Sequence, residues 1–176
     1  TPLSYPWETC MTMGNSWSYV PNDTYKSAPQ LIQLLVKIVS RGGNFLLNIG
    51  PGPTGDFDPV AYERLKAIGA WMKINGEGIY HSKPFAPYSS GNIFFTQNKS
   101  DQSVYAFYLA KENENTIPPT VVIKNFSLSK GAKVSTFGAT SNLKWQADGN
   151  NIIISIPKKL QQQPPGQYAW CFKIKQ

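Results

Sequence analysis

The stretch GGNFLLNIGPGPTGDFDP, residues 42–59, contains the feature that decides the fold. Residues 45–49 form a short apolar run that only Asn48 interrupts, and Gly50 with Pro51 ends it. A continuous apolar run of this length, bounded by turn residues, is typical of a strand buried on both faces, as in a parallel sheet. The stretch therefore predicts a buried parallel strand followed by a Gly/Pro-rich loop.

Helical patterns flank this strand on both sides. Before it, Ser27 and Gln30 have the form of a capping box, and apolar residues then recur on one helix face as far as the Gly-Gly pair. After it, Asp58 and Pro59 are typical of a helix start, and a second amphipathic pattern follows. The apolar positions are Leu31, Leu34, Leu35 and Ile38 in the first helix and Ala61, Leu65, Ile68 and Met72 in the second.

Helix, buried strand, loop and helix is the order of a β/α unit, which alone leaves its strand edges unpaired. We therefore expect residues 1–85 to be the closing segment of a larger α/β structure that begins before Thr1. From residue 86 the apolar pattern alternates with a period of two, which predicts an antiparallel β-sandwich over residues 86–176 and a boundary near residues 83–90. Seven segments carry this pattern: NIFFTQ, SVYAFYLA, TVVIKNFSL, AKVSTFG, LKWQA, NIIISIP and QYAWCFKIK.

The last segment predicts a strand with two different faces. Tyr168, Trp170, Phe172 and Ile174 are expected to share one face, and Cys171 is expected on the other.

Composition restricts the classes of function. The formal net charge is +7, but the basic residues are spread singly over the predicted strands, which favours solvated outer faces over a nucleic-acid interface. No apolar run is long enough for a membrane span, and no leader pattern is present. Cys10 and Cys171 are the only cysteines, which excludes a disulfide framework and a thiolate metal site. Sequons at Asn22, Asn98 and Asn125 are compatible with secretion without establishing it.

A second stretch, WETCMTMGNSWSY at residues 7–19, carries the candidate site residues. Glu8 lies between Trp7 and Cys10, where burial against indole rings raises a carboxyl pKa as a general acid requires; a hydrogen bond to a neighbouring loop is the alternative. Trp17 and Tyr19 have flat faces that suit a sugar ring, or equally a protein core.

Other polar residues carry weaker signals. Asn48 either reaches a ligand or, as we favour, satisfies a loop backbone. His81, the only histidine, stands outside any metal-like spacing and is expected at the surface or between domains. The phosphate-binding glycine motifs and the serine-hydrolase motif are absent.

These two stretches, together with ERLKAIGAWMKINGEGIY, resemble in order and spacing the C-terminal third of the glycoside hydrolase family 29 α-L-fucosidases. The β-rich tail resembles that family's C-terminal sandwich, including its LKW and YAW elements, so the resemblance covers essentially the whole chain. It implies the last part of a (β/α)8-like barrel followed by a β-sandwich. It also implies exo-acting release of α-linked L-fucose with retention of configuration, which proceeds without metal or organic cofactor.

The resemblance also assigns roles to residues. The family's aspartate nucleophile lies on an earlier strand, so this sequence alone is expected to be inactive. Glu8 is either the acid/base or a carboxylate that supports the site without touching substrate, because the acid/base position varies among members. Trp17 matches an aromatic residue that lines the fucose pocket, and Trp7 and Tyr19 are further candidates for substrate binding. Ser18 stands where many members have Gly.

The expected partners are a fucosylated glycan or glycoconjugate and the upstream part of the same enzyme, with no nucleic acid, no membrane span and possible homo-oligomers. The expected location is extracytoplasmic: secreted, periplasmic or lysosomal. Two alternatives remain open, a non-catalytic carbohydrate-binding module and an inactive fucosidase-like lectin. The β/α unit speaks against the free-standing module, because such a module would not retain open strand edges.

Overall fold

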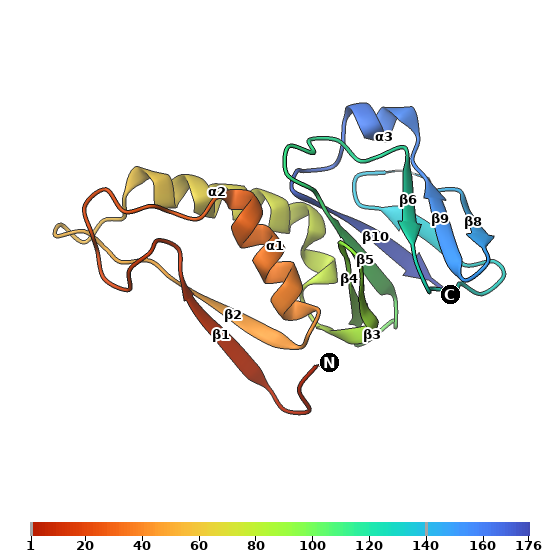
Figure 1. Cartoon of the computed structure of the whole chain (residues 1–176), viewed down its shortest axis with the longest axis horizontal. Helices are drawn as coiled ribbons and strands as arrows, with labels where there is room; N and C mark the ends of the chain where they lie inside the picture. The colour runs from red at the N-terminus through yellow and green to blue at the C-terminus, as the bar shows by residue number, and fades with distance from the viewer. Residues whose placement is uncertain (1, 140) are drawn as a thin grey trace.

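The computed structural model describes residues 2–139 and 141–176 of the chain. The first half contains two parallel strands, β1 (Trp7–Thr12) and β2 (Gly43–Asn48), connected through helix α1 (Ala28–Val39). Helix α2 (Pro59–Asn75) follows β2 and leads into the short 3-10 turn η1 (Gly76–Gly78). Figure 1 shows both helices lying between the strand pair and the second half of the molecule.

The second half consists of two antiparallel sheets. The five-stranded sheet has the order β3-β4-β5-β10-β7, and the three-stranded sheet has the order β6-β9-β8. All seven segments with alternating apolar residues form strands, which confirms the predicted β-sandwich. The strands are β3 (Ser82–Ser90), β4 (Ile93–Asn98), β5 (Val104–Leu109), β6 (Thr120–Ile123), β7 (Lys133–Thr136), β8 (Trp145–Asp148), β9 (Asn151–Ser155) and β10 (Ala169–Lys175), with the short helix α3 (Lys158–Gln162) between β9 and β10.

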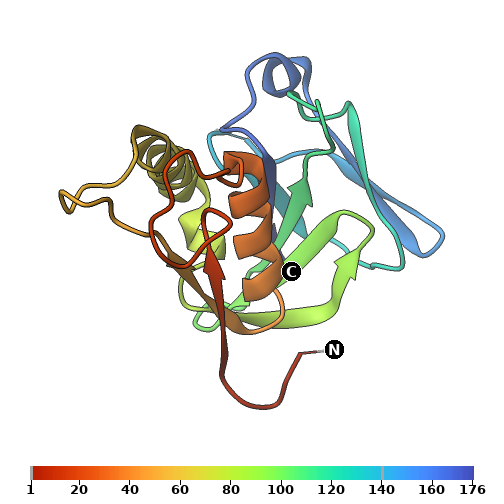
Figure 2. The ribbon, with the colours of Figure 1, turned by 60° about the vertical axis from the view of Figure 1, so that its left-hand side comes forward.

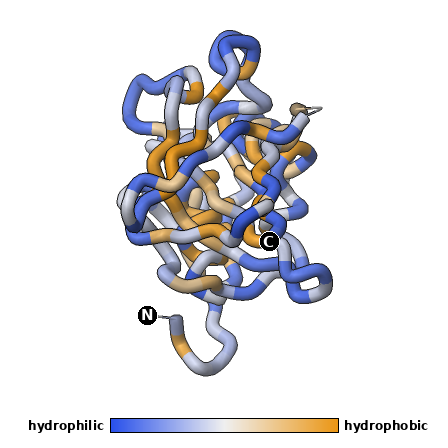
Figure 3. Tube along the Cα trace, turned by 90° about the vertical axis from the view of Figure 1, so that its right-hand side faces the viewer, coloured by the Kyte–Doolittle hydropathy of each residue, from blue (hydrophilic) through white to orange (hydrophobic). Residues whose placement is uncertain are grey.

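The five-stranded sheet is covered on both faces, which makes it the centre of the molecule. One face packs on the three-stranded sheet through residues such as Phe95, Trp170 and Phe172. The other face packs on helices α1 and α2 through residues such as Tyr105 and Phe107. Figure 2 shows the helices and the second sheet on opposite sides of this layer, and Figure 3 shows apolar residues concentrated inside and polar residues in the connecting loops. Every residue of β5 is buried as a result.

The two predicted helices are confirmed, together with the capping box. The Ser27 side chain accepts a hydrogen bond from the Gln30 backbone, and the Gln30 side chain accepts one from the Ser27 backbone. Asp58 precedes α2 as expected, but its side chain makes no capping bond. It accepts a hydrogen bond from the Tyr25 hydroxyl instead, at 3.0 Å.

Strand β3 was not expected, because Pro84 and Pro87 interrupt its sequence. It is an edge strand, where proline is tolerated since the missing N–H is not needed for pairing on the outer side. The predicted boundary between residues 85 and 86 lies inside this strand. The division into residues 1–85 and 86–176 stays a prediction.

The predicted face of Tyr168 is wrong. Trp170, Phe172 and Ile174 share the face toward the three-stranded sheet as expected, and Cys171 lies on the other face. Tyr168, however, precedes the strand and packs on the helix side together with Cys171. The cause is its backbone φ of +74°, which breaks the alternation of an extended strand.

A charged cluster joins η1 to the central sheet. Glu77 accepts a hydrogen bond from the Tyr105 hydroxyl at 2.8 Å and contacts the Lys173 ammonium, and Asp101 lies 3.8 Å from that ammonium. Burial acts to raise the pKa of Glu77, but the hydrogen bonds from Lys173 and Tyr105 prevail and hold its pKa below the ordinary 4.5. Burial and the hydrogen bond to Glu77 raise the pKa of Tyr105.

The lowered pKa of Glu77 predicts a pH-dependent contribution to stability. A carboxylate whose pKa is lower in the folded state stabilises the fold above its unfolded pKa, and this contribution is lost as the pH falls through the folded value. We expect Glu77→Gln to lower Tm by about 1–3 °C at neutral pH, since the group is half-exposed. Thermal melts should show this difference vanishing well below pH 4.5. A difference of equal size in acid would contradict the assignment.

Candidate functional site

The carboxyl ends of β1 and β2 lie at the same edge because the strands are parallel. Thr12 is opposite Asn48 in the register, and the Met13 N–H donates to the Asn48 carbonyl at 2.8 Å, so pairing continues to the end of both strands. Two loops leave this edge, residues 13–27 toward α1 and residues 49–58 toward α2, and Figure 1 shows them on the same side of the molecule. In parallel α/β structures such an edge is where sites are built.

The first loop is folded around the carboxylate of Asp23. One oxygen accepts from the Asn15 N–H at 2.9 Å and the Ser16 N–H at 3.4 Å, and the other accepts from the Thr24 N–H at 2.7 Å. Gly14 lies so close that a Cβ there would overlap the Asp23 carboxylate. Asp23 thus fixes the backbone that leads directly to Trp17.

Lys26 ties the two ends of this loop together. Its ammonium donates to the carbonyls of Thr12 at 2.7 Å and Gly14 at 3.1 Å, and its N–H donates to the Met13 carbonyl at 2.8 Å. Its own carbonyl accepts from the Arg64 guanidinium on α2, at 3.2 Å. The loop is therefore anchored to the strand and to a helix.

The two loops touch at Gly50. A Cβ at this position would lie 2.5 Å from the Tyr19 nitrogen and 2.7 Å from the Ser18 carbonyl carbon. The Tyr19 ring also lies over Gly52. This contact leaves Trp17 at the outer side of the loop, with 59% of its surface exposed.

The polar side chains of Tyr25 and Asn48 lie near these loops and differ in whether they have a hydrogen-bond partner. Burial, reinforced by the hydrogen bond to Asp58, raises the pKa of Tyr25, so its hydroxyl stays protonated and donating. The Asn48 side-chain oxygen is buried and accepts no hydrogen bond from any residue in 2–139 or 141–176. The favoured interpretation, that this side chain satisfies a loop backbone, is therefore not seen.

The structure separates the predicted site residues. Trp17 and Tyr19 lie together in the loop at the carboxyl edge. Glu8 is exposed and lies four residues before the end of β1. Its side chain is on the face of the strand pair opposite to that of Trp7. Trp7 covers Gly43 with its ring and donates from its indole to the Arg41 carbonyl at 3.2 Å. Both residues thus lie near the amino end of the strands, away from the loops.

This geometry does not favour two of the predicted roles. Trp7 contacts the start of β2 and the segment after α1, which explains its size without a substrate. Glu8 is not packed against indole rings in the described part of the chain, because alternation along the strand puts its side chain on the other face. Sequence reasoning missed Asp23, Lys26 and Gly50, which organise the loops.

Four further observations bear on function. His81 is exposed, and its ring nitrogen lies 3.0 Å from the Ser100 hydroxyl. Residues 2–139 and 141–176 contain no cluster of three or more His, Cys, Asp or Glu side chains suited to a metal ion. None of the helices in this part of the chain has the length and apolar character needed to cross a membrane. Burial raises the pKa of the Cys171 thiol, which keeps it unreactive in the core.

Comparison with known proteins identifies relatives over nearly the whole chain. A model of the family described as Alpha-L-fucosidase matches residues 1–77, and a model described as Alpha-L-fucosidase C-terminal domain matches residues 87–175. Tissue α-L-fucosidase of Mus musculus is 36% identical, and the match covers 98% of this chain and 39% of the mouse protein. The Homo sapiens tissue enzyme is 33% identical over 98% of this chain and 38% of its own length.

A solved structure agrees with the sequence matches. The α-fucosidase of Thermotoga maritima in complex with fucose superimposes with a TM-score of 0.86 at 28% identity, over 99% of this chain and 40% of the bacterial chain. The chain thus spans about 39% of the length of these relatives. One family model alone matches half of the chain, and the resemblance seen in the three sequence motifs is confirmed. The chain belongs to the α-L-fucosidase family.

Proposed function

We propose that this chain is the C-terminal portion of an exo-acting retaining α-L-fucosidase, which releases α-linked L-fucose from glycans or glycoconjugates. The observation that carries the proposal is the carboxyl edge of β1 and β2, where an anchored loop holds an exposed Trp17 beside the strand exits. An indole face suits the apolar face and C5 methyl group of fucose, which water solvates poorly. The relatives that match the chain on both sides of this edge bear the same activity in their names.

The parallel strand pair supports a larger barrel. Leu46 on β2 is 44% exposed, and it points away from the helices, on the same face as Glu8 and Cys10 of β1. Within the described residues, β1 and β2 pair only with each other, so each has a free edge. We propose that further strands of a (β/α)8-like barrel cover this face and both edges, because such edges are costly in a folded domain.

The two carboxylates near this edge hold the loops in place and are not free to take part in catalysis. Retaining hydrolysis needs a nucleophile and an acid/base about 5 Å apart. Asp23 is bonded to three backbone N–H groups and Asp58 to the Tyr25 hydroxyl, so both serve the loops. We propose that the nucleophile comes from another part of the enzyme and that this chain alone is inactive. The buried Asn48 oxygen would receive its donor from that part or from the sugar.

Glu8 is proposed to support the barrel interior without acting as the acid/base. Its place near the amino end of β1 is far from the edge where the sugar would bind. Loss of a general acid costs about 10²–10⁴-fold in rate. We therefore expect Glu8→Gln to lower kcat/KM by less than about tenfold and to keep both limbs of the pH profile. Loss of the high-pH limb would instead identify Glu8 as the acid/base.

The proposed activity is tested by hydrolysis of an aryl α-L-fucoside by the whole protein, with the aryl β-D-galactoside as control. Turnover of the fucoside alone supports the proposal. Absence of turnover would favour an inactive fucosidase-like lectin. The exposed sequon residues Asn22 and Asn125 and the relatives named plasma α-L-fucosidase support an extracytoplasmic location for the enzyme. Homo-oligomers remain an expectation that sedimentation would test.

A further inference from the structure

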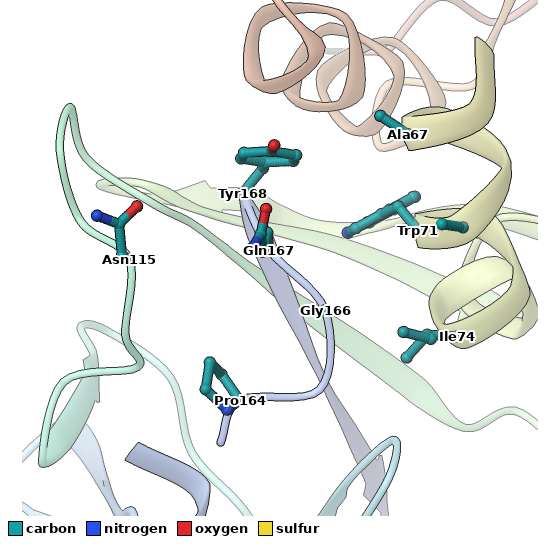
Figure 4. A pocket seen from close by; sticks show the side chains of 9 residues that line it. Ala67, Trp71, Ile74, Asn115, Pro164, Gly166, Gln167 and Tyr168 are labelled. Atoms are coloured by element: carbon teal, nitrogen blue, oxygen red, sulfur yellow. The ribbon is translucent and has the colours of Figure 1, made fainter. Parts of the chain in front are cut away.

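A cavity of about 500 Å³ lies at the seam between α2 and the sandwich, apart from the loops of the candidate site. Figure 4 shows Trp71 and Ile74 of α2 on one side of it and Asn115, Gln167 and Tyr168 on the other. Its size falls in the range of about 300–1,000 Å³ that is usual for small-molecule sites. The complete lining is Ala67, Ala70, Trp71, Ile74, Asn115, Pro164, Gly166, Gln167 and Tyr168.

The backbone at Tyr168 has a strained conformation, and this conformation places the Tyr168 side chain in the cavity wall. The Ala169 N–H donates to the Gln167 carbonyl at 2.9 Å, which makes Tyr168 the central residue of a γ-turn with φ +74°. This form of the turn is rare and costs energy for a residue with a Cβ. The Tyr168 carbonyl is fixed by the Ala110 N–H at 3.0 Å and the Gln33 amide at 3.2 Å. Without the turn, the ring would lie on the opposite face of the strand.

The polar side chains that line this cavity are uncharged and can form hydrogen bonds to a ligand. Its lining includes no charged side chain. The Trp71 indole N–H is already used by the Ala169 carbonyl at 2.8 Å. Among the described residues, the side chains of Asn115, Gln167 and Tyr168 make no hydrogen bond to protein. Two amides and a phenol beside aromatic surface match the hydroxyls and the C–H face of a neutral sugar, whereas a charged group inside this first cavity would lack a counter-ion.

A second depression, of about 580 Å³, continues from the first. The two share Asn115 and Tyr168, and the second extends to Ser27 and Gln30 at the start of α1. Ser27 ends the loop that carries Trp17, so the combined groove runs from the seam toward the candidate site. Unlike the first cavity, this depression has charged residues at its rim, namely Lys111, Glu112 and Glu114. The Glu114 carboxylate accepts hydrogen bonds from the Tyr108 hydroxyl and the Lys111 N–H. Two adjoining depressions of about 500 and about 580 Å³ suit a chain of sugars better than a single ring.

We propose that this seam groove is a second carbohydrate-binding site, which takes a neutral, fucose-free portion of a glycan and uses Tyr168 as its aromatic platform. Sugar binding at this site does not depend on the proposed hydrolysis, whereas its role in substrate recognition rests on that proposed function. It would hold the body of a glycan while a terminal sugar is in the catalytic pocket. Binding energy from a part of the substrate that does not react is a common source of specificity.

The test is titration of the whole enzyme with N-acetyllactosamine, a neutral disaccharide without fucose, in the presence of saturating L-fucose. We expect saturable binding in the wild type. Tyr168→Gly should weaken it by about tenfold, because glycine accepts the positive φ while the ring is lost. The matched control is Tyr88→Gly, since Tyr88 also has a positive φ, +68°, and lines neither depression. Its binding should match the wild type.

A third variant keeps the test decisive in case Tyr168→Gly fails to fold. Asn115 is exposed, so Asn115→Ala should leave Tm unchanged and weaken binding by at least about threefold. Hydrolysis of an aryl α-L-fucoside should be normal in all three variants, which separates this site from the catalytic one. The proposal is overturned if the wild type does not bind the disaccharide, if Asn115→Ala binds as wild type, or if Tyr88→Gly is as weak as Tyr168→Gly.

Discussion

Trp17→Ala in the whole enzyme is expected to raise the inhibition constant of free L-fucose by about tenfold or more. Trp17 is the one large aromatic side chain that the anchored loop at the carboxyl edge leaves 59% exposed. An aromatic contact with the sugar contributes on the order of 1 kcal/mol beyond the area it buries, and about 1.4 kcal/mol is tenfold in affinity. Inhibition of aryl fucoside hydrolysis by L-fucose measures the effect directly.

Two controls separate binding from loop damage. Trp17→Phe keeps a flat apolar face and should recover most of the affinity. Tyr80→Ala removes an aromatic side chain that is 67% exposed near the amino ends of the strands, and it should leave inhibition unchanged. An inhibition constant that stays at the wild-type value in Trp17→Ala would remove Trp17 from the pocket.

The fold was predictable from the sequence wherever the pattern of apolar residues matches the burial of those residues in the folded chain. The capping box at Ser27 and the alternating strands of the sandwich appear as expected, because each apolar position is buried by the layer that the pattern implies. The pattern failed at β3, where two prolines conceal an edge strand, and at Tyr168, where a γ-turn reverses one side chain. Neither feature has a periodic signal, because proline and a positive φ act on the backbone at single positions.

The candidate site was predictable only in part, because its organising residues act through the backbone. Trp17 was predicted from its residue type and from a family resemblance, and its role in the pocket stays a prediction. Asp23 was not, since an aspartate that accepts loop N–H groups has no distinctive spacing in sequence. The roles of Trp7 and Glu8 were ambiguous until strand alternation and register placed them on opposite faces, near the amino end of β1.

Gly50→Ala is expected to lower the activity of the whole enzyme strongly, because it adds a methyl group where the two loops touch. The new Cβ would lie 2.5 Å from the Tyr19 nitrogen, and the atoms it meets belong to the backbone, which cannot rotate away as a flexible side chain does. The loop that carries Trp17 must therefore shift. A displacement of about 1 Å in a positioning element can cost on the order of 10²-fold in rate, so we expect kcat/KM to fall by about that factor.

The control for this variant is Gly69→Ala. Gly69 lies in helix α2, and a Cβ there meets no atom within 4 Å. This change should raise stability by about 0.5–1 kcal/mol, as expected for Ala in place of Gly in a helix, and should leave kcat/KM unchanged. Steady-state kinetics and thermal melts of both variants measure these expected changes in kcat/KM and in stability. If Gly50→Ala retained wild-type kcat/KM, the contact between the two loops could not be what positions Trp17, and the site would have to be organised through Asp23 and Lys26 alone.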